Sequence, residues 1–81
     1  MKLHPITQVV TEGGSVAPGM RHIEFILSAD FSGTINGASM AGTGSNAVPA
    51  VGVYVLDAPP GDVLAGLNYQ IGGGAAILTT F

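Results

Sequence analysis

The chain has 81 residues, of which 47% are hydrophobic and only 9% charged, with a net charge of −3 at pH 7 and no cysteine. These values exclude disulfides and cysteine-based zinc sites, and the two basic residues are too few to bind a nucleic-acid backbone. The length allows one small domain, residues 1–81. Charged residues make up about 25% of an ordinary domain, so we expect the surface of this charge-poor domain to be partly covered by other protein subunits.

The first half of the chain alternates apolar and polar residues with period two, which predicts β-strands. Thr7–Thr11 is rich in β-branched residues and predicts a short strand. Gly13-Gly14 and Pro18-Gly19 predict turns, and residues 1–20 are expected to form an extended N-terminal arm. In residues 22–31 the alternation predicts a half-buried strand or strand pair, whose apolar face consists of Ile23, Phe25, Leu27, Ala29 and Phe31. Only Ile26 interrupts the polar face.

Asn36-Gly37 is the strongest turn signal, because this dipeptide accepts the two positive φ angles of a type I′ hairpin turn. The turn would pair Thr34 with Ser39 and Gly33 with Met40.

Three further strands are predicted in the second half. Residues 51–56 carry apolar side chains on both faces and should be covered on both. Leu67, Tyr69 and Ile71 share one face of the next strand. Residues 75–81 form the last, with Ile77, Thr79 and Phe81 on one side.

Turn signals separate these strands at intervals typical of sandwiches and barrels. Pro60-Gly61 fits the centre of a tight turn, and Gly72-Gly73-Gly74 fits another reversal. Residues 63–66 could instead form a single helical turn. The sequence therefore predicts an all-β fold, a small antiparallel sandwich or barrel of about six or seven short strands.

Membrane insertion is not expected. The uncharged runs at residues 31–56 and 63–81 are interrupted by glycine, asparagine or proline, whereas a spanning helix needs about 20 mostly apolar residues. The low charge is therefore best explained by burial in a protein assembly.

The stretch AGTGSNA, residues 41–47, matches the dinucleotide-binding pattern G-x-G-x-x-[GA] at Gly42, Gly44 and Ala47. That pattern binds phosphate only when a helix follows the glycines. Here Pro49 and a predicted strand follow instead, so no cofactor is expected. We interpret the stretch as a loop between strands that contacts solvent or a partner.

Other polar residues are also better explained by structure than by chemistry. Asp57 and Asp62 suggest a calcium site or a carboxylate pair, but turn capping is favoured because further oxygen ligands are not evident. His22 and Glu24 could begin a metal site, yet no third ligand is evident. We therefore expect no metal, no nucleophile–base pair and no enzymatic activity. The candidate contact residues are Arg21, Glu24, Gly42, Gly44, Asn46, Tyr54, Tyr69 and Phe81.

Three segments, RHIEFILSADFSGTING, AGTGSNAVPAVGVYVL and GGGAAILTTF, give the chain its overall character. In style, it resembles the small β-rich structural proteins of tailed bacteriophages, namely capsid decoration (cement), head-fibre and small tail proteins. The resemblance implies a virion component without catalytic activity that forms a homo-oligomer, often a trimer, and contacts other virion proteins such as the major capsid protein. Capsid decoration is the leading expectation. The alternative is a tail or fibre module that binds a host receptor through residues 42–49 and 57–62.

Overall fold

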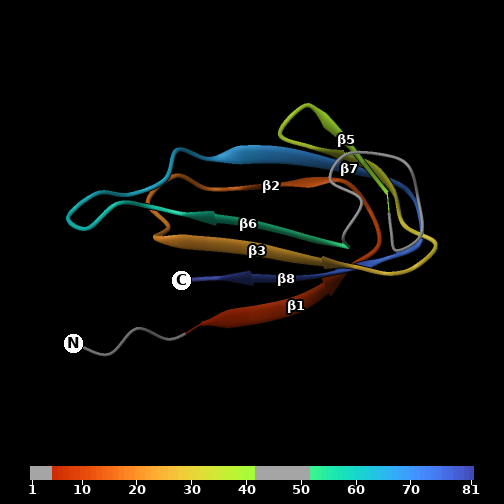
Figure 1. The fold of residues 1–81 in the computed structure, drawn as a ribbon, viewed down its shortest axis with the longest axis horizontal. Coiled ribbons are helices and arrows are strands. Elements are labelled where there is room, and N and C mark those ends of the chain that lie inside the picture. Colours follow the sequence, from red (N-terminus) through yellow and green to blue (C-terminus); the bar gives the residue numbers. More distant parts are fainter. Residues whose placement is uncertain (1–4, 42–51) are drawn as a thin grey trace.

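The computed structural model describes residues 5–41 and 52–81, which form a two-layer antiparallel β-sandwich (Figure 1). Sheet A has the strand order β1-β8-β3-β6, and sheet B has the order β2-β7-β4-β5. The strands of sheet A are β1 (Ile6–Val10), β8 (Ala76–Thr80), β3 (His22–Leu27) and β6 (Val53–Asp57). Those of sheet B are β2 (Gly14–Val16), β7 (Leu67–Gly73), β4 (Ser32–Ile35) and β5 (Ala38–Ala41). The predicted all-β antiparallel fold is confirmed.

The core lies between the two sheets, where every second residue of each strand points inward. Sheet A contributes Ile23, Phe25 and Leu78, each at most 2% exposed, and sheet B contributes Ile35 at 0%. Phe25 makes an edge-to-face contact with Tyr69 of β7, with ring centroids 5.2 Å apart. Leu67, Tyr69 and Ile71 share the inner face of β7, as the sequence predicts.

The hairpin predicted at Asn36-Gly37 is present with the predicted register. Thr34 lies opposite Ser39, and Gly33 lies opposite Met40. Asn36 and Gly37 have φ angles of 52° and 84°, the left-handed values that a type I′ turn requires.

The turn predicted at Pro60-Gly61 is also present. The Asp62 amide donates to the Pro59 carbonyl at 3.0 Å, and Gly61 has a φ of 82°. The reversal predicted in the glycine triplet joins β7 to β8 at Gly74, whose φ is 72°.

Three expectations differ from the structure, and the alternative of a helical turn at residues 63–66 is not realised. The alternation in residues 22–31 continues past the end of β3 into a turn, where the Phe31 amide donates to the Ser28 carbonyl and Ala29 is exposed. Residues 63–66 are irregular rather than helical. The described part of the expected N-terminal arm is instead paired in the sandwich, as β1 against β8 and β2 against β7. None of the described residues belongs to a helix that could cross a membrane.

The third of these expectations concerns β6, which the sequence predicts to be covered on both faces. Its Tyr54 and Leu56 are half-buried toward the core, but Val53 and Val55 are 40% and 43% exposed on the opposite face. In the single chain, the outer face of sheet A is therefore open.

Candidate interaction surface

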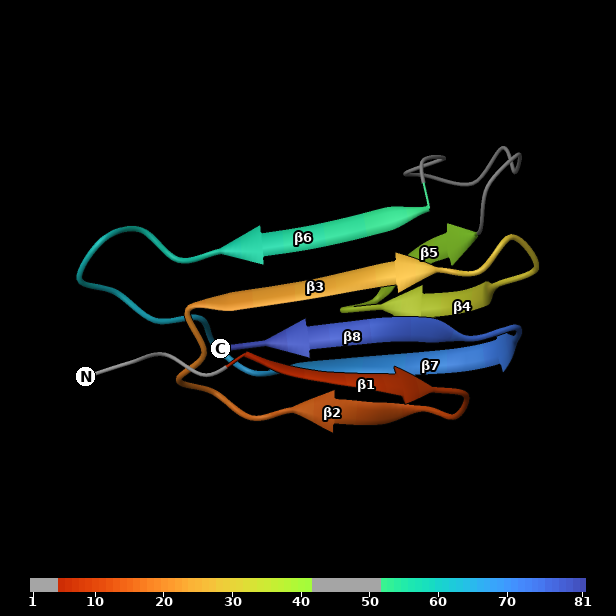
Figure 2. The same ribbon diagram turned by 90° about the horizontal axis from the view of Figure 1, so that it is seen from below.

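A row of aliphatic side chains crosses the whole outer face of sheet A. The strand register places Val9 of β1 opposite Ile77 of β8, Ile77 opposite Ile26 of β3, and Ile26 opposite Val53 of β6. Figure 2 shows these four strands side by side in the order β6, β3, β8, β1. We call the four residues Val9, Ile77, Ile26 and Val53 the aliphatic row.

The row faces away from the core because side chains alternate across each strand. In β3, Ile23, Phe25 and Leu27 fill the interior, so Ile26 must point outward. The same alternation in β8 buries Leu78 and exposes Ile77. The row is 40–69% exposed, with Val9 at the sheet edge the most exposed. Together with Val55, the aliphatic row forms a contiguous apolar patch on the outer face of sheet A.

The next row on the same face is mainly polar. Thr7 lies opposite Thr79, Thr79 opposite Glu24, and Glu24 opposite Val55. The hydroxyls of Thr7 and Thr79 are hydrogen-bonded at 3.1 Å. This row forms a polar margin along one side of the aliphatic row.

Beyond this margin, His22 of β3 lies between two carboxylates. Its Nδ1 is 2.5 Å from Asp57 Oδ1 of β6, and its Nε2 is 3.2 Å from Glu24 Oε1. The ring of Phe81 stacks on the imidazole, with centroids 4.8 Å apart. The Phe81 carbonyl accepts the His22 amide at 2.9 Å, which fixes the C-terminal residue against β3.

This arrangement favours the charged form of His22. A neutral imidazole has one N–H donor, whereas both ring nitrogens here face carboxylate oxygens. The hydrogen bond to Asp57 raises the pKa of His22 above its ordinary value of 6.5; burial opposes the rise, and Glu24 adds to it. In the charged form, both ring nitrogens carry a proton and donate to these two carboxylates.

A hollow of about 180 Å³ lies at the other side of the aliphatic row. Its lining is almost entirely apolar and includes three members of the row. The lining residues are Val9, Ile26, Leu27, Ser28, Ala75, Ala76 and Ile77. The small side chains of Ala75 and Ser28 leave room here for an apolar group from a facing molecule.

The outer face of sheet B has a different composition. Four outward residues of β2, β4 and β7 are uncharged and polar: Ser15 of β2 lies opposite Asn68 of β7, and Thr34 of β4 lies opposite Gln70 of β7. Asn68 and Gln70 are exposed. The two outer faces of the sandwich are thus chemically distinct, one aliphatic and one amide- and hydroxyl-rich.

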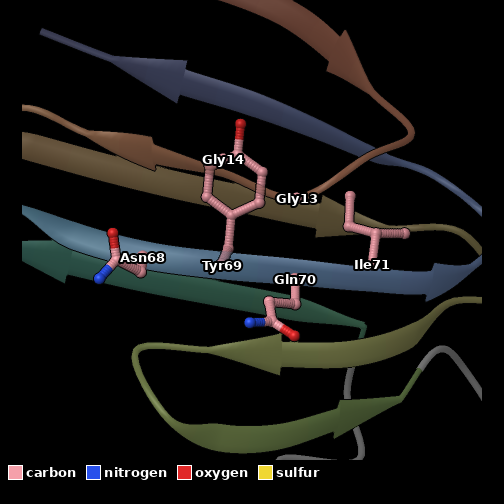
Figure 3. Close-up of a pocket in the computed structure, with 6 residues that line it drawn as sticks. All are labelled: Gly13, Gly14, Asn68, Tyr69, Gln70 and Ile71. Atoms are coloured by element: carbon pink, nitrogen blue, oxygen red, sulfur yellow. The ribbon is translucent and has the colours of Figure 1, made fainter.

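Sheet B also carries an open hollow of about 480 Å³ beside β7, lined by Gly13, Gly14, Asn68, Tyr69, Gln70 and Ile71 (Figure 3). Figure 3 shows Asn68 and Gln70 pointing to one side of the strand and Tyr69 and Ile71 to the other. A Cβ on Gly14 would lie 2.9 Å from the Tyr69 hydroxyl oxygen, so glycine is required for the tyrosine to pack below it. Two of the residues that line the hollow are glycines, and none of them is charged.

The structure places the predicted contact residues in several environments. Arg21 is exposed just before β3, Glu24 is half-buried on the outer face of sheet A, and Phe81 is half-buried against His22. Tyr54 faces the interior beside Phe25, and Tyr69 is a core residue with 7% exposure. Two of the predicted contact residues, Glu24 and Phe81, both contact His22. Gly42, Gly44 and Asn46, and with them the predicted receptor-binding stretch at residues 42–49, lie outside the described residues.

The aspartates that flank residues 58–61 act separately. Asp57 binds His22, whereas Asp62 Oδ1 accepts the Val63 amide at 3.0 Å, which fits the turn-capping interpretation. Glu24 and Asp57 contact opposite nitrogens of His22, and within the described residues no group of three or more histidine or carboxylate side chains is arranged so that it could hold a metal ion. Within the described part of a single chain, Arg21 forms no ion pair with Glu24 or Asp30.

Sequence reasoning did not select the aliphatic row. One signal was present, because Ile26 is the only apolar residue on the polar face of its strand. The union of Ile26 with Val9, Val53 and Ile77 depends on strand register, which no local pattern determines.

Comparisons with protein-family models, with curated proteins and with solved structures find no match to this chain.

Proposed function

We propose that this protein is a structural component of a virion that decorates and stabilises a capsid by binding neighbouring protein subunits. Its aliphatic face would be buried in the assembly, and its polar sheet B face would point outward. Two things support this proposal: the resemblance of the sequence to small structural proteins of tailed bacteriophages, and the difference between the two outer faces of the sandwich.

The contrast between the two outer faces is the observation that carries the proposal. Sheet A exposes Val9, Ile26, Val53, Val55 and Ile77. The outer face of sheet B instead carries the uncharged polar residues Ser15, Thr34, Asn68 and Gln70 on β2, β4 and β7. Removing apolar surface from water is favourable by about 25 cal/mol per Å². A sandwich with one aliphatic and one polar outer face is suited to covering a surface while remaining wettable on its far side.

The composition supports the same function. Only 9% of the residues are charged, so the chain gains little solubility from its own surface. The strand β1 lies at the edge of sheet A and has no charged residue or proline between Ile6 and Val10. Such an edge associates readily with other chains unless it is covered.

The test is to locate the protein in virions purified from a culture that produces it. Quantitative mass spectrometry should find it in a fixed ratio to the major coat protein. Particles that lack it should release their nucleic acid at a lower temperature than complete particles. Its absence from purified virions would overturn the proposal.

Loop variants separate decoration from host recognition. Replacing residues 58–61 with a short Gly-Ser linker should leave particle stability unchanged if the aliphatic face is the attachment surface. Stable particles that lose host attachment would support the receptor-binding alternative instead. The matched variant Ile77→Lys, on the aliphatic face, should release the protein from particles.

A further inference from the structure

The turn at Asn36-Gly37, which joins β4 to β5, is chemically labile as well as suited to a hairpin. We infer that Asn36 is a site of spontaneous covalent modification, at which the side-chain amide is lost through a cyclic imide to leave aspartate or isoaspartate. This conversion detaches the edge strand β5 from β4. Water is the only reactant that it consumes, and it is independent of the proposed virion function because it concerns one hairpin of the folded chain.

The conversion has two steps. In the first, the backbone nitrogen of Gly37 attacks the Cγ atom of Asn36, a new N–C bond forms, and the proton of that nitrogen leaves with the side-chain amide group as ammonia. In the second, water adds to one of the two carbonyls of the five-membered imide and reopens the ring. One opening gives aspartate, and the other gives isoaspartate, whose main chain runs through Cβ. Either product makes the net charge one unit more negative than −3.

Both the sequence and the structure select Asn36 for this reaction. The chain has three asparagines, of which only Asn36 precedes a glycine, a residue with no side chain to hinder the approach of its nitrogen. Asn36 and Gly37 are both exposed. Within the described part of the chain, and apart from its two sequence neighbours, no atom lies within 4 Å of the position that a Cβ on Gly37 would occupy. Asn68 precedes Tyr69 inside β7, between β2 and β4, and serves as the internal comparison.

The closed turn is not the reactive conformation. The first central residue of a type I′ turn has a ψ of about +30°, and the positive φ angles of Asn36 and Gly37 fit this turn. At that ψ the Gly37 nitrogen lies on the side of the Cα–C bond away from Cβ of Asn36. The five-membered imide requires the nitrogen and Cβ on the same side, so the reaction needs a large rotation about this bond.

The rotation displaces β5 and leaves β4 in place. The Asn36 amide donates to the Asn68 carbonyl at 2.8 Å, and the Ile35 side chain is fully buried in the core, so the chain before the rotating bond is held. The strand after the bond is β5, which lies at the edge of sheet B and, among the described strands, pairs with β4 alone. The reaction therefore proceeds through a local opening of the hairpin that leaves the core folded.

Isoaspartate prevents the hairpin from closing again in its original register. It adds one carbon to the main chain of a turn whose two-residue length pairs Ile35 with Ala38 and Thr34 with Ser39. The strand β5 consequently stays detached after the conversion.

The test is incubation of the full chain at mildly alkaline pH, once in buffer and once in concentrated guanidinium chloride. Ion-exchange chromatography would separate the more negative product, and mass spectrometry with electron-transfer fragmentation would locate it and distinguish aspartate from isoaspartate. We expect conversion at Asn36 and none at Asn68 in the folded chain. Conversion at Asn36 should be at least about tenfold slower in buffer than in guanidinium chloride, because only the opened hairpin reacts.

Two matched variants test whether opening of the hairpin controls the reaction. Thr34→Gly removes a β-branched residue from β4, and it should accelerate conversion in buffer about fivefold without changing the rate in guanidinium chloride. Thr7→Gly makes the same substitution in β1, the edge strand of sheet A, and should leave both rates unchanged. Far-UV circular dichroism would show that both variants are folded in buffer.

Hydrogen exchange would test the release of β5. In the purified isoaspartate form, the amides of Ala38–Ala41 should lose protection, while those of β3 and β8 keep it.

Several results would overturn the inference. An unreacted Asn36 in guanidinium chloride would remove the site itself. Equal rates in buffer and in guanidinium chloride, or equal acceleration by Thr34→Gly and Thr7→Gly, would remove the local opening. Full protection of β5 in the isoaspartate form would remove its release. All of these measurements use the isolated chain, so the presence or absence of the protein in virions does not affect them.

Discussion

Tyr69 offers a sharp test, because it is one of the contact residues predicted from the sequence, whereas the structure places it in the core. Its side chain is 7% exposed and packs edge-to-face on Phe25 at 5.2 Å. Truncating a large buried aromatic residue costs about 3–5 kcal/mol, which already includes its packing contacts. A domain of this length has a total stability of about 4–12 kcal/mol. Tyr69→Ala should therefore lose a large fraction of its stability and lower Tm by about 15–30 °C.

Urea and thermal unfolding followed by far-UV circular dichroism would measure this loss. Tyr69→Phe is the control, because it keeps the ring and removes only the hydroxyl, and it should change stability by less than about 1 kcal/mol. The experiment should be run at low protein concentration, where association contributes least. A loss below about 1.5 kcal/mol in Tyr69→Ala, together with a lower oligomer mass, would refute the core assignment and favour a contact role.

Two further predictions concern the hairpin strand and the histidine. Gly33→Ala should cost about 3 kcal/mol or more in urea unfolding, because its Cβ would overlap the backbone carbonyl oxygen of Gln70; Gly72→Ala, with 3.6 Å to its nearest neighbour, should cost less than about 1 kcal/mol. Equal losses in the two variants would contradict the close β4–β7 pairing. Because the pKa of His22 is raised in the folded state, its contribution to stability is complete below pH 6.5 and is lost as pH rises through the folded-state pKa. The loss should stay below about 1 kcal/mol, since Asp57 is 68% exposed, and NMR titration of a His4→Asn variant should show the high His22 pKa falling when Asp57→Asn is added. A His22 pKa at or below 6.5 would refute this pairing.

The local features of the fold could be predicted because they depend on neighbouring residues. Asn36-Gly37 specifies a type I′ turn because both residues adopt positive φ angles. That two-residue turn then determines that Thr34 pairs with Ser39. The alternation in β3 likewise determined that Ile23, Phe25 and Leu27 face inward.

Features that depend on distant residues could not be predicted in the same way. The strand β2 contains Gly14 and Ser15, which have little strand preference, and it exists because β7 offers an edge with room for a glycine over Tyr69. The contact of His22 with Asp57 joins residues 35 positions apart. It requires the β3–β6 register, as does the position of Val53 at the end of the aliphatic row.

The expectation that β6 is covered on both faces connects the sequence to the proposed assembly. Its valines have the composition of a buried strand, yet Val53 and Val55 are exposed in the single chain. A partner on the outer face of sheet A would bury them and account for the composition. The same partner would also account for the low charge of the whole chain.

Hydroxyl-radical footprinting with mass spectrometry would test burial of the aliphatic face most directly. The protein would be labelled once in dilute solution and once in its assembled form, and modification compared residue by residue. We predict strong protection of Val9, Ile26 and Ile77 on assembly, with no change at Asn68 and Gln70. Unchanged labelling of the aliphatic row, or protection confined to the outer face of sheet B, would contradict the account.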